Sequence, residues 1–308
     1  MPLIEVVPNI SEGRRPDIVA ALAATFHDAA DVTLLDYSSD ATHNRSVFTA
    51  VGEPAPLILA LLAMYTAALT RIDLRQHQGV HPRVGAVDVT PFVPLTPDDL
   101  PCCVDAAHAL GHEVAARFGL PVFFYEAAAR APHRRPLEAL RRGGLSGLTA
   151  RLADALWTPD CGPSSPHPTG GVTVIGSRLP LVAFNVQLAT EDLELARRIA
   201  RAVRTSGGGL PAVKAIGVAT ADPHIVQVSM NLVDYSRTSV WEAFEAVSRE
   251  AERSGVNVHD SEIIGLAPSA ALLDAATTAL RLRAFKSHRL LECRLQTARS
   301  APPPDEAT

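Results

Sequence analysis

The chain is poor in several features that would place it in other protein classes. It has only four cysteines in 308 residues, and two of them, Cys102 and Cys103, are adjacent. Adjacent cysteines are poorly placed to pair with each other and form no Cys-x-x-Cys zinc knuckle, so we expect reduced thiols. The net charge of −5 gives no general attraction to nucleic acid or to an anionic membrane. We therefore expect neither nucleic acid nor membrane among the partners.

Long apolar runs are also missing. The longest, residues 55–69, contains Pro56 and is shorter than the roughly 20 residues that cross a bilayer. The first residues lack a basic start and include Glu5, which is not the pattern of a secretory signal. We expect a cytoplasmic protein in which residues 55–69 form a buried helix.

Common catalytic and metal motifs are absent as well. His77, His81 and Asp88 cluster in sequence, and His108 and His112 are four apart on an expected helix, but no His-Glu-x-x-His occurs. No Gly-x-Ser-x-Gly elbow is present. The three glycines at 207–209 precede no Lys-Ser or Lys-Thr, so they more simply end a helix. We expect no metal and no nucleophilic serine.

The composition that is present, 47% hydrophobic and 20% charged, suits a soluble chain of about two domains. Alternation between β-branched runs and helical periodicity predicts an α+β class with two ferredoxin-like subdomains, whose mixed sheets are covered by helices. Residues 157–171 break the periodicity with four prolines and three glycines. We place one subdomain at 1–175, the second at 176–297, and a disordered tail at 298–308.

The expected elements are these. Strands are predicted at 3–7, 32–36, 45–51, 86–93, 121–125, 181–186, 213–219, 225–231 and 263–266. Helices are predicted at 15–29, 53–72, 103–118, 191–205, 239–254 and 269–280. The stretch 127–156 is basic and helical.

Polar residues gather where the predicted strands end. Each could be a simple turn or cap residue, but together they favour a pocket: Asn9, Ser11, Glu12, Asp36, Ser38, Asp40, His43, Asn44, Arg45, His81, Arg83 and Asp88. Among them His81 has the side chain best suited to take and return a proton near neutral pH. Pro82 and the glycines at 79 and 85 would fix where it points.

Several separated motifs resemble the formiminotransferase family of glutamate formimidoyltransferases, which in animals are fused to a cyclodeaminase domain; we expect the standalone form here. The resemblance runs from about residue 3 to 282. It rests on these segments: 7–13 (VPNISEG), 34–36 (LLD), 44–47 (NRSV), 81–92 (HPRVGAVDVTPF), 159–163 (PDCGP), 182–186 (VAFNV) and 265–268 (GLAP).

The resemblance implies a two-subdomain fold with the active site in a cleft between the halves, and a homodimer. It implies transfer of the formimino group from N-formimino-L-glutamate to N5 of tetrahydrofolate, a co-substrate, during histidine breakdown. His81 takes the place of the family's catalytic histidine, and Asp36 or Asp40 would orient it. The family's folate-contacting loop falls on Gly162, Pro163, Ser164, Ser165, Pro166, His167, Pro168, Thr169, Gly170 and Gly171.

Both substrates carry carboxylates, so an anion-binding group is required. Our candidates are Arg83, Arg45 and Arg178, with Asn9 and Asn44 as further substrate contacts. The chain departs from the expected pattern at Pro166, His167, Thr169 and Gly170 in the loop, and at Ser38, where we expect an acid. These departures bear on pterin packing and on the acid that orients His81.

Two alternatives stay open. The same fold and folate could serve a formyltransferase that uses N-formylglutamate, or a related folate cycloligase-like activity. The chain could also be a folate-binding or protein-interaction module without turnover. Assays with both donors, and a test for glutamate release, separate these cases.

Overall fold

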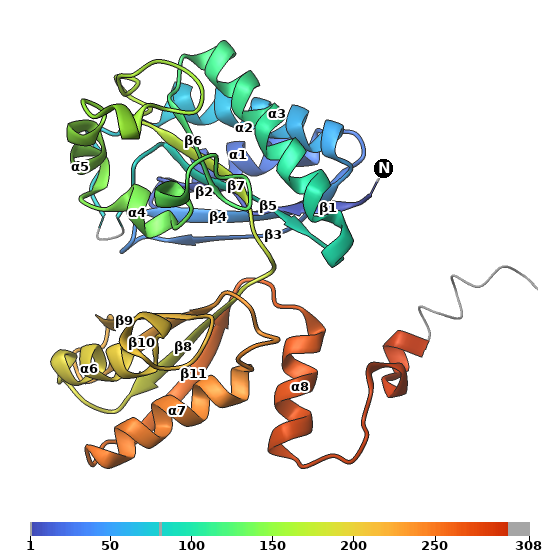
Figure 1. The fold of residues 1–308 in the computed structure, drawn as a ribbon, viewed down its shortest axis with the longest axis vertical. Helices are drawn as coiled ribbons and strands as arrows, with labels where there is room; N and C mark the ends of the chain where they lie inside the picture. Colours follow the sequence, from blue (N-terminus) through green and yellow to red (C-terminus); the bar gives the residue numbers. More distant parts are fainter. Residues whose placement is uncertain (1, 80–81, 295–308) are drawn as a thin grey trace, which may run out of the picture. The chain divides into compact units, whose positions relative to one another are not determined.

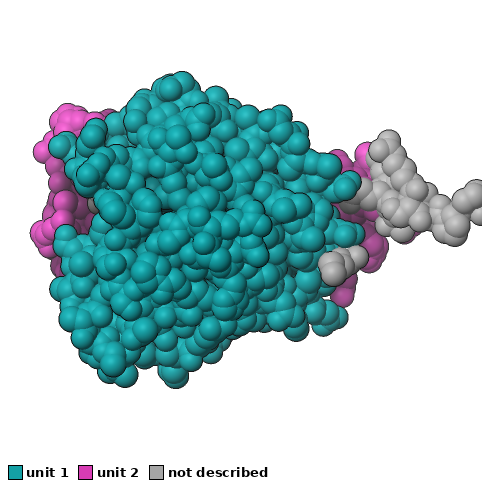
Figure 2. All heavy atoms as spheres, turned by 90° about the horizontal axis from the view of Figure 1, so that it is seen from above, with its two compact units in different colours: residues 1–180 teal, residues 181–308 magenta. Residues whose placement is uncertain are grey.

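The computed structural model describes residues 2–79 and 82–294. His81 and the tail expected at 298–308 lie outside the described residues. The chain divides into two compact units, residues 1–180 and 181–308, coloured separately in Figure 2. The boundary expected near residue 175 falls inside the last strand of the first unit.

The first unit is built on one mixed sheet. Its strands are β1 (Ile4–Val6), β2 (Asn9–Ile10), β3 (Val32–Asp40), β4 (Arg45–Gly52), β5 (Val87–Pro94), β6 (Val122–Glu126) and β7 (Thr173–Ser177). The order is β1-β4-β2-β5-β7-β6, with β3 beside β4. The pairs of β7 with β5 and β6 are parallel and the others antiparallel.

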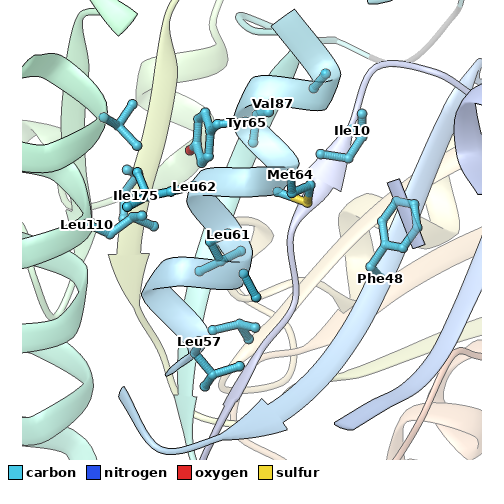
Figure 3. Close-up of a cluster of buried hydrophobic side chains, with 14 of the residues drawn as sticks. Ile10, Phe48, Leu57, Leu61, Leu62, Met64, Tyr65, Val87, Leu110 and Ile175 are labelled. Atoms are coloured by element: carbon cyan, nitrogen blue, oxygen red, sulfur yellow. The ribbon is translucent and has the colours of Figure 1, made fainter. Parts of the chain in front are cut away.

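Three helices cover one face of this sheet: α1 (Pro16–His27), α2 (Pro54–Arg71) and α3 (Leu100–Phe118). Their apolar sides form one core with the strands, and Figure 3 shows Leu57, Leu61 and Tyr65 of α2 in it. Helix α2 is the one described helix long and apolar enough to cross a membrane. Leu57, Leu61 and Tyr65 are fully buried, so one side of α2 belongs to the core.

A second, smaller core lies on the opposite face of the sheet. Alternate residues of β6 point to opposite faces: Val122 and Phe124 join the α1–α3 core, whereas Phe123 joins the second core. Two short helices, α4 (Leu137–Arg141) and α5 (Gly144–Arg151), complete the second core with Leu140 and Leu148. Strand β5 is consequently buried on both faces.

The second unit has the order β8 (Val182–Leu188), α6 (Leu193–Val203), β9 (Val213–Ala219), β10 (Val226–Leu232), α7 (Val240–Arg253) and β11 (Val258–Ile264), followed by α8 (Ser269–Ala279). Its sheet order is β11-β8-β10-β9, the ferredoxin-like arrangement. Ser239 and Glu242 form a capping box at the start of α7. Short 3₁₀ turns lie at Pro97–Asp99, Pro132–Arg134, Ala155–Trp157, Thr205–Gly207 and Ser287–Arg289.

The predicted class, two α/β subdomains with helix-covered sheets, is confirmed. The second sheet is antiparallel throughout and not mixed as expected. The two strands that each helix connects run parallel, but another strand lies between them in the sheet. Strands β2 and β7 were not predicted. Strand β11 begins earlier than predicted, since its polar start at 259–262 (HDSE) lacks the β-branched pattern of a strand.

Candidate functional site

The face of the first sheet opposite α1–α3 carries several of the predicted polar residues. Phe48 and Ala50 of β4 point into the α1–α3 core, so Arg45 and Thr49 point to the other face. Cross-strand pairing extends this set: Asp40 pairs with Arg45, Asp36 with Thr49, and Asn9 with Val47. The sheet thus brings Asn9, Asp36, Asp40 and Arg45 to one face.

Asn44 ties three loops together at the end of this face. It has a left-handed backbone, with φ of 49°, in the turn between β3 and β4. Its Oδ1 accepts from Gly13 N at 2.8 Å, and its Nδ2 donates to the Gln78 carbonyl at 2.9 Å. Its carbonyl lies 3.0 Å from His77 Nε2. Asn44 is therefore a structural junction of the site.

Arg83 lies against the same junction. Its guanidinium contacts the His77 ring and donates to the Gly79 carbonyl at 2.6 Å. Burial, and then the positive charge of Arg83, lower the pKa of His77, which keeps this imidazole neutral near pH 7. A depression of about 330 Å³ adjoins them, lined by Leu74, His77, Gly79, Pro82, Arg83, Gly144 and Leu145.

The end of the predicted folate loop meets the segment that follows position 81. Gly85 and Gly171 form an antiparallel bridge, flanked by hydrogen bonds from Ala86 N to the Gly170 carbonyl and from Val172 N to the Val84 carbonyl, at 2.9 and 2.8 Å. Two segments about 85 residues apart in the chain therefore lie side by side.

His167 shapes the turn of that loop. Its Nδ1 accepts from Gly170 N at 2.9 Å, which requires a neutral ring protonated on Nε2. The first half of the loop is different: residues 162–165 are exposed. Of the ten predicted folate residues, those from His167 to Gly171 lie next to the site segment.

Asp88 is buried, and its carboxylate fixes the segment that leads into β5. Its Oδ1 accepts from Val84 N at 2.7 Å, and its Oδ2 accepts from Arg141 at 2.5 Å. Arg141 ends α4 and was not among our predicted site residues. Its only sequence signal was membership of the basic stretch 127–156, which contains several equivalent arginines.

Other predicted residues are placed less centrally. Asp40 accepts from the His43 backbone and from His43 Nδ1, at 2.8 and 2.6 Å, and these hydrogen bonds overcome burial to lower its pKa. Arg178 follows β7 and donates to the Phe92 carbonyl through its backbone. It stands near Glu5, at the far end of the strands, about 20 Å along the sheet from Arg45.

The described residues contain no group of three or more His, Cys, Asp or Glu side chains that could hold a metal ion. Beside its carboxylates and the His77 ring, the site presents arginines, amides and backbone N–H groups. Such groups bind anions and planar polar ligands.

Comparisons with known proteins give the family. Residues 3–178 match the formiminotransferase domain, N-terminal subdomain, and residues 183–287 match the formiminotransferase domain. A glutamate formimidoyltransferase of Streptococcus pyogenes serotype M1 is 44% identical, covering 93% of this chain and 96% of the relative. One of Thermoplasma acidophilum is 40% identical, covering 97% and 99%. The formimidoyltransferase-cyclodeaminase of Sus scrofa is 40% identical over 89% of this chain and 52% of its own length. Two domain matches in the order of the two units, and relatives aligned along almost the whole chain, make this protein a member of the formiminotransferase family.

Proposed function

We propose that this protein transfers the formimino group of N-formimino-L-glutamate to N5 of tetrahydrofolate, giving 5-formiminotetrahydrofolate and L-glutamate. The observation that carries the proposal is the identity of 44% and 40%, over nearly the whole length of both chains, to proteins named glutamate formimidoyltransferase. The pairing of residues 84–86 with residues 170–172 supports it, because the resemblance assigns catalysis to His81, just before the first segment, and folate to the loop that ends at Gly171.

The chemistry needs one group that moves a proton. N5 of the folate attacks the formimino carbon, a tetrahedral intermediate forms, and the bond from that carbon to the glutamate nitrogen breaks. We assign His81 to take the N5 proton and to return it to the leaving nitrogen. Asp36 or Asp40 would hold the tautomer of that imidazole, and Arg83 and Arg45 would bind substrate carboxylates.

Tetrahydrofolate is proposed as co-substrate, held by the loop from Gly162 to Gly171. We further propose that the enzyme is a cytoplasmic homodimer. Size-exclusion chromatography with light scattering tests the dimer directly.

The test of function is a three-way assay. Purified protein is mixed with tetrahydrofolate and with formiminoglutamate, N-formylglutamate or, as a blank, no donor. Glutamate release and the absorbance of the folate product are followed together. We expect release with formiminoglutamate; release only with N-formylglutamate, or folate binding without any release, would refute the proposal.

A further inference from the structure

Arg45 carries a half-buried positive charge on the face of the sheet opposite α1–α3. Its Nε is buried and has no partner in residues 2–79 and 82–294. Burial lowers the pKa of Arg45 to about 10, so the side chain is still a cation at pH 7. A buried cation is costly unless it is paired and hydrogen-bonded. An unpaired one therefore points to a ligand.

Arg141 is in a similar state. It is mostly buried, with 13% of its side chain exposed, and one of its Nη atoms binds Asp88. Its Nε is buried and has no partner within the described chain. A guanidinium has five N–H donors in a planar fork, so Arg141 has donors left over after it has bound Asp88.

Helix α4, which ends in Arg141, is anchored by hydrogen bonds from Arg151. Arg151 donates to the Ala139 and Leu140 carbonyls, at 2.7 and 3.0 Å, and its guanidinium lies over the Trp157 ring at 4.2 Å. These contacts complete the last turn of α4, whose carbonyls have no partner within the helix. Arg141 is therefore presented from a fixed position.

The two arginines share one face of the sheet. Arg45 points to the face opposite α1–α3, and α4, which ends in Arg141, packs on that face through Leu140. Strands β4 and β5 are both neighbours of β2, which separates them by about 10 Å. The charges of Arg141 and Asp88 both act on Arg45.

The nearby negative charges are already engaged. Asp88 is held by Val84 N and by Arg141. Asp40 lies opposite Arg45 in the strand register. The Asp40 carboxylate, however, binds His43, and the Asp40 side chain is 52% exposed. The region as a whole is rich in cations although the chain is acidic overall. The groups are Arg14, Arg15, Arg45, Arg83 and Arg141 against Glu12, Asp36, Asp40 and Asp88.

We propose that Arg45 and Arg141 form a subsite that binds a carboxylate group of a substrate, with Asp88 holding Arg141 in place. The inference rests on the proposed function, in which both substrates carry carboxylates. A carboxylate accepts N–H donors in a plane and matches the guanidinium fork. Its oxygens would accept from the Nη groups of the two guanidiniums, and its charge would reduce the excess of positive charge.

The first test measures binding without turnover. Calorimetry with glutarate and with L-glutamate compares the wild-type protein with Arg45→Gln, Arg45→Lys and the control Arg117→Gln, an exposed arginine paired with Glu113 on α3. We expect Arg45→Gln to weaken binding roughly 10- to 100-fold, the range of one charge-assisted contact, with Arg45→Lys between it and wild type. Equal affinity in wild type and Arg45→Gln would overturn the subsite, whether or not the protein turns over formiminoglutamate.

Thermal unfolding separates a ligand-binding role from a structural one. Because the Arg45 Nε is buried without a partner in the described residues, removing the charge relieves a desolvation penalty. We expect the Tm of Arg45→Gln, without ligand, to equal or exceed that of wild type. A large fall in Tm would mean that Arg45 stabilises the fold, and would contradict the proposal.

A substrate series then identifies which carboxylate is bound. Rates are measured with N-formimino-4-aminobutyrate, which lacks the α-carboxylate of the donor, with N-formimino-2-aminobutyrate, which lacks its side-chain carboxylate, and with tetrahydropteroate, which lacks the glutamyl tail of the folate. If Arg45 binds one of these carboxylates, the loss caused by Arg45→Gln and the loss caused by deleting that carboxylate will not add. Coupling to one analogue identifies the carboxylate that Arg45 binds; additive losses with all three analogues would refute the subsite.

Discussion

Gly85 and Gly171 lie opposite each other in an antiparallel bridge, and neither position has room for a side chain. A Cβ on Gly85 would lie 2.0 Å from the Val172 carbonyl oxygen, and one on Gly171 would lie 2.4 Å from that of Val84. The residues after position 81 and the end of the predicted folate loop can pair only because both positions are glycine. The bridge thus joins the two halves of the proposed site within the first unit.

Gly171→Ala is expected to loosen this bridge. Position 171 has φ of +70°, so alanine is strained there in addition to meeting the Val84 carbonyl. The matched control is Gly119→Ala, where φ is +62° and nothing lies within 4 Å. We expect Gly171→Ala to lose about 1–3 kcal/mol more than Gly119→Ala, measured by urea unfolding. It should also raise the KM for tetrahydrofolate, which Gly119→Ala should leave unchanged.

Equal losses of stability in the two variants would mean that the backbone at 171 relaxes freely. The close approach of the two segments would then not be required for the fold.

His81→Ala tests the proposed proton carrier. General acid–base catalysis contributes about 10²- to 10⁴-fold, so kcat should fall by that range. Folate affinity, measured by fluorescence titration, should stay within about twofold because the loop from Gly162 to Gly171 is unaltered. Turnover close to the wild-type value would remove His81 from this role.

The sequence predicts best those elements whose pattern lies in consecutive residues. Helices such as α2 and α7 were predicted within a few residues because their apolar period and caps are written in consecutive residues. Strand β2, Asn9–Ile10, was not, because two residues contain no period. Its pairing comes entirely from β4 and β5 on either side.

The site shows the same division. Arg83 and Asn44 stand beside turn residues and were identified from sequence, and the structure brings them together. Arg141 was missed because its role depends on a contact with Asp88, 53 residues away in the chain. Arg178 was proposed from charge alone, and charge does not say at which end of a strand a residue will lie.

Two variants of Asp88 distinguish the contribution of charge from that of hydrogen bonding in the buried Asp88–Arg141 pair. Asp88→Asn keeps an oxygen for Val84 N but loses the charge that pairs with Arg141, whereas Asp88→Ala loses both. Leaving one member of a buried pair without its partner costs about 3–5 kcal/mol. We expect both variants to be destabilised in chemical denaturation, Asp88→Ala the more so by about 1 kcal/mol.

The double variant Asp88→Asn with Arg141→Gln provides the control for that experiment. Removal of both charges should recover much of the stability, because neither member of this pair is left charged without the other. If the double variant loses as much unfolding free energy as the two single variants lose together, the two residues do not interact energetically.

Glu12 should make stability depend on pH in the acid range. Its side chain is only 2% exposed. Burial alone raises the pKa of this carboxyl, but hydrogen bonds from Arg14 N, from the Arg15 side chain and from Arg15 N together lower it below 4.5. A carboxyl whose pKa is lower in the folded than in the unfolded state binds fewer protons when folded. The contribution of Glu12 to the free energy of unfolding is therefore complete above about pH 4.5 and is lost as the pH falls through the folded-state pKa.

Glu12→Gln isolates that contribution. Glutamine keeps an oxygen that can accept from Arg14 N but cannot titrate or pair with Arg15. Thermal unfolding between pH 3 and 7 should therefore show a wild-type Tm above that of Glu12→Gln at pH 7. The two curves should converge below pH 4.5. Parallel curves across the whole range would show that the proton uptake of unfolding comes from other carboxyls.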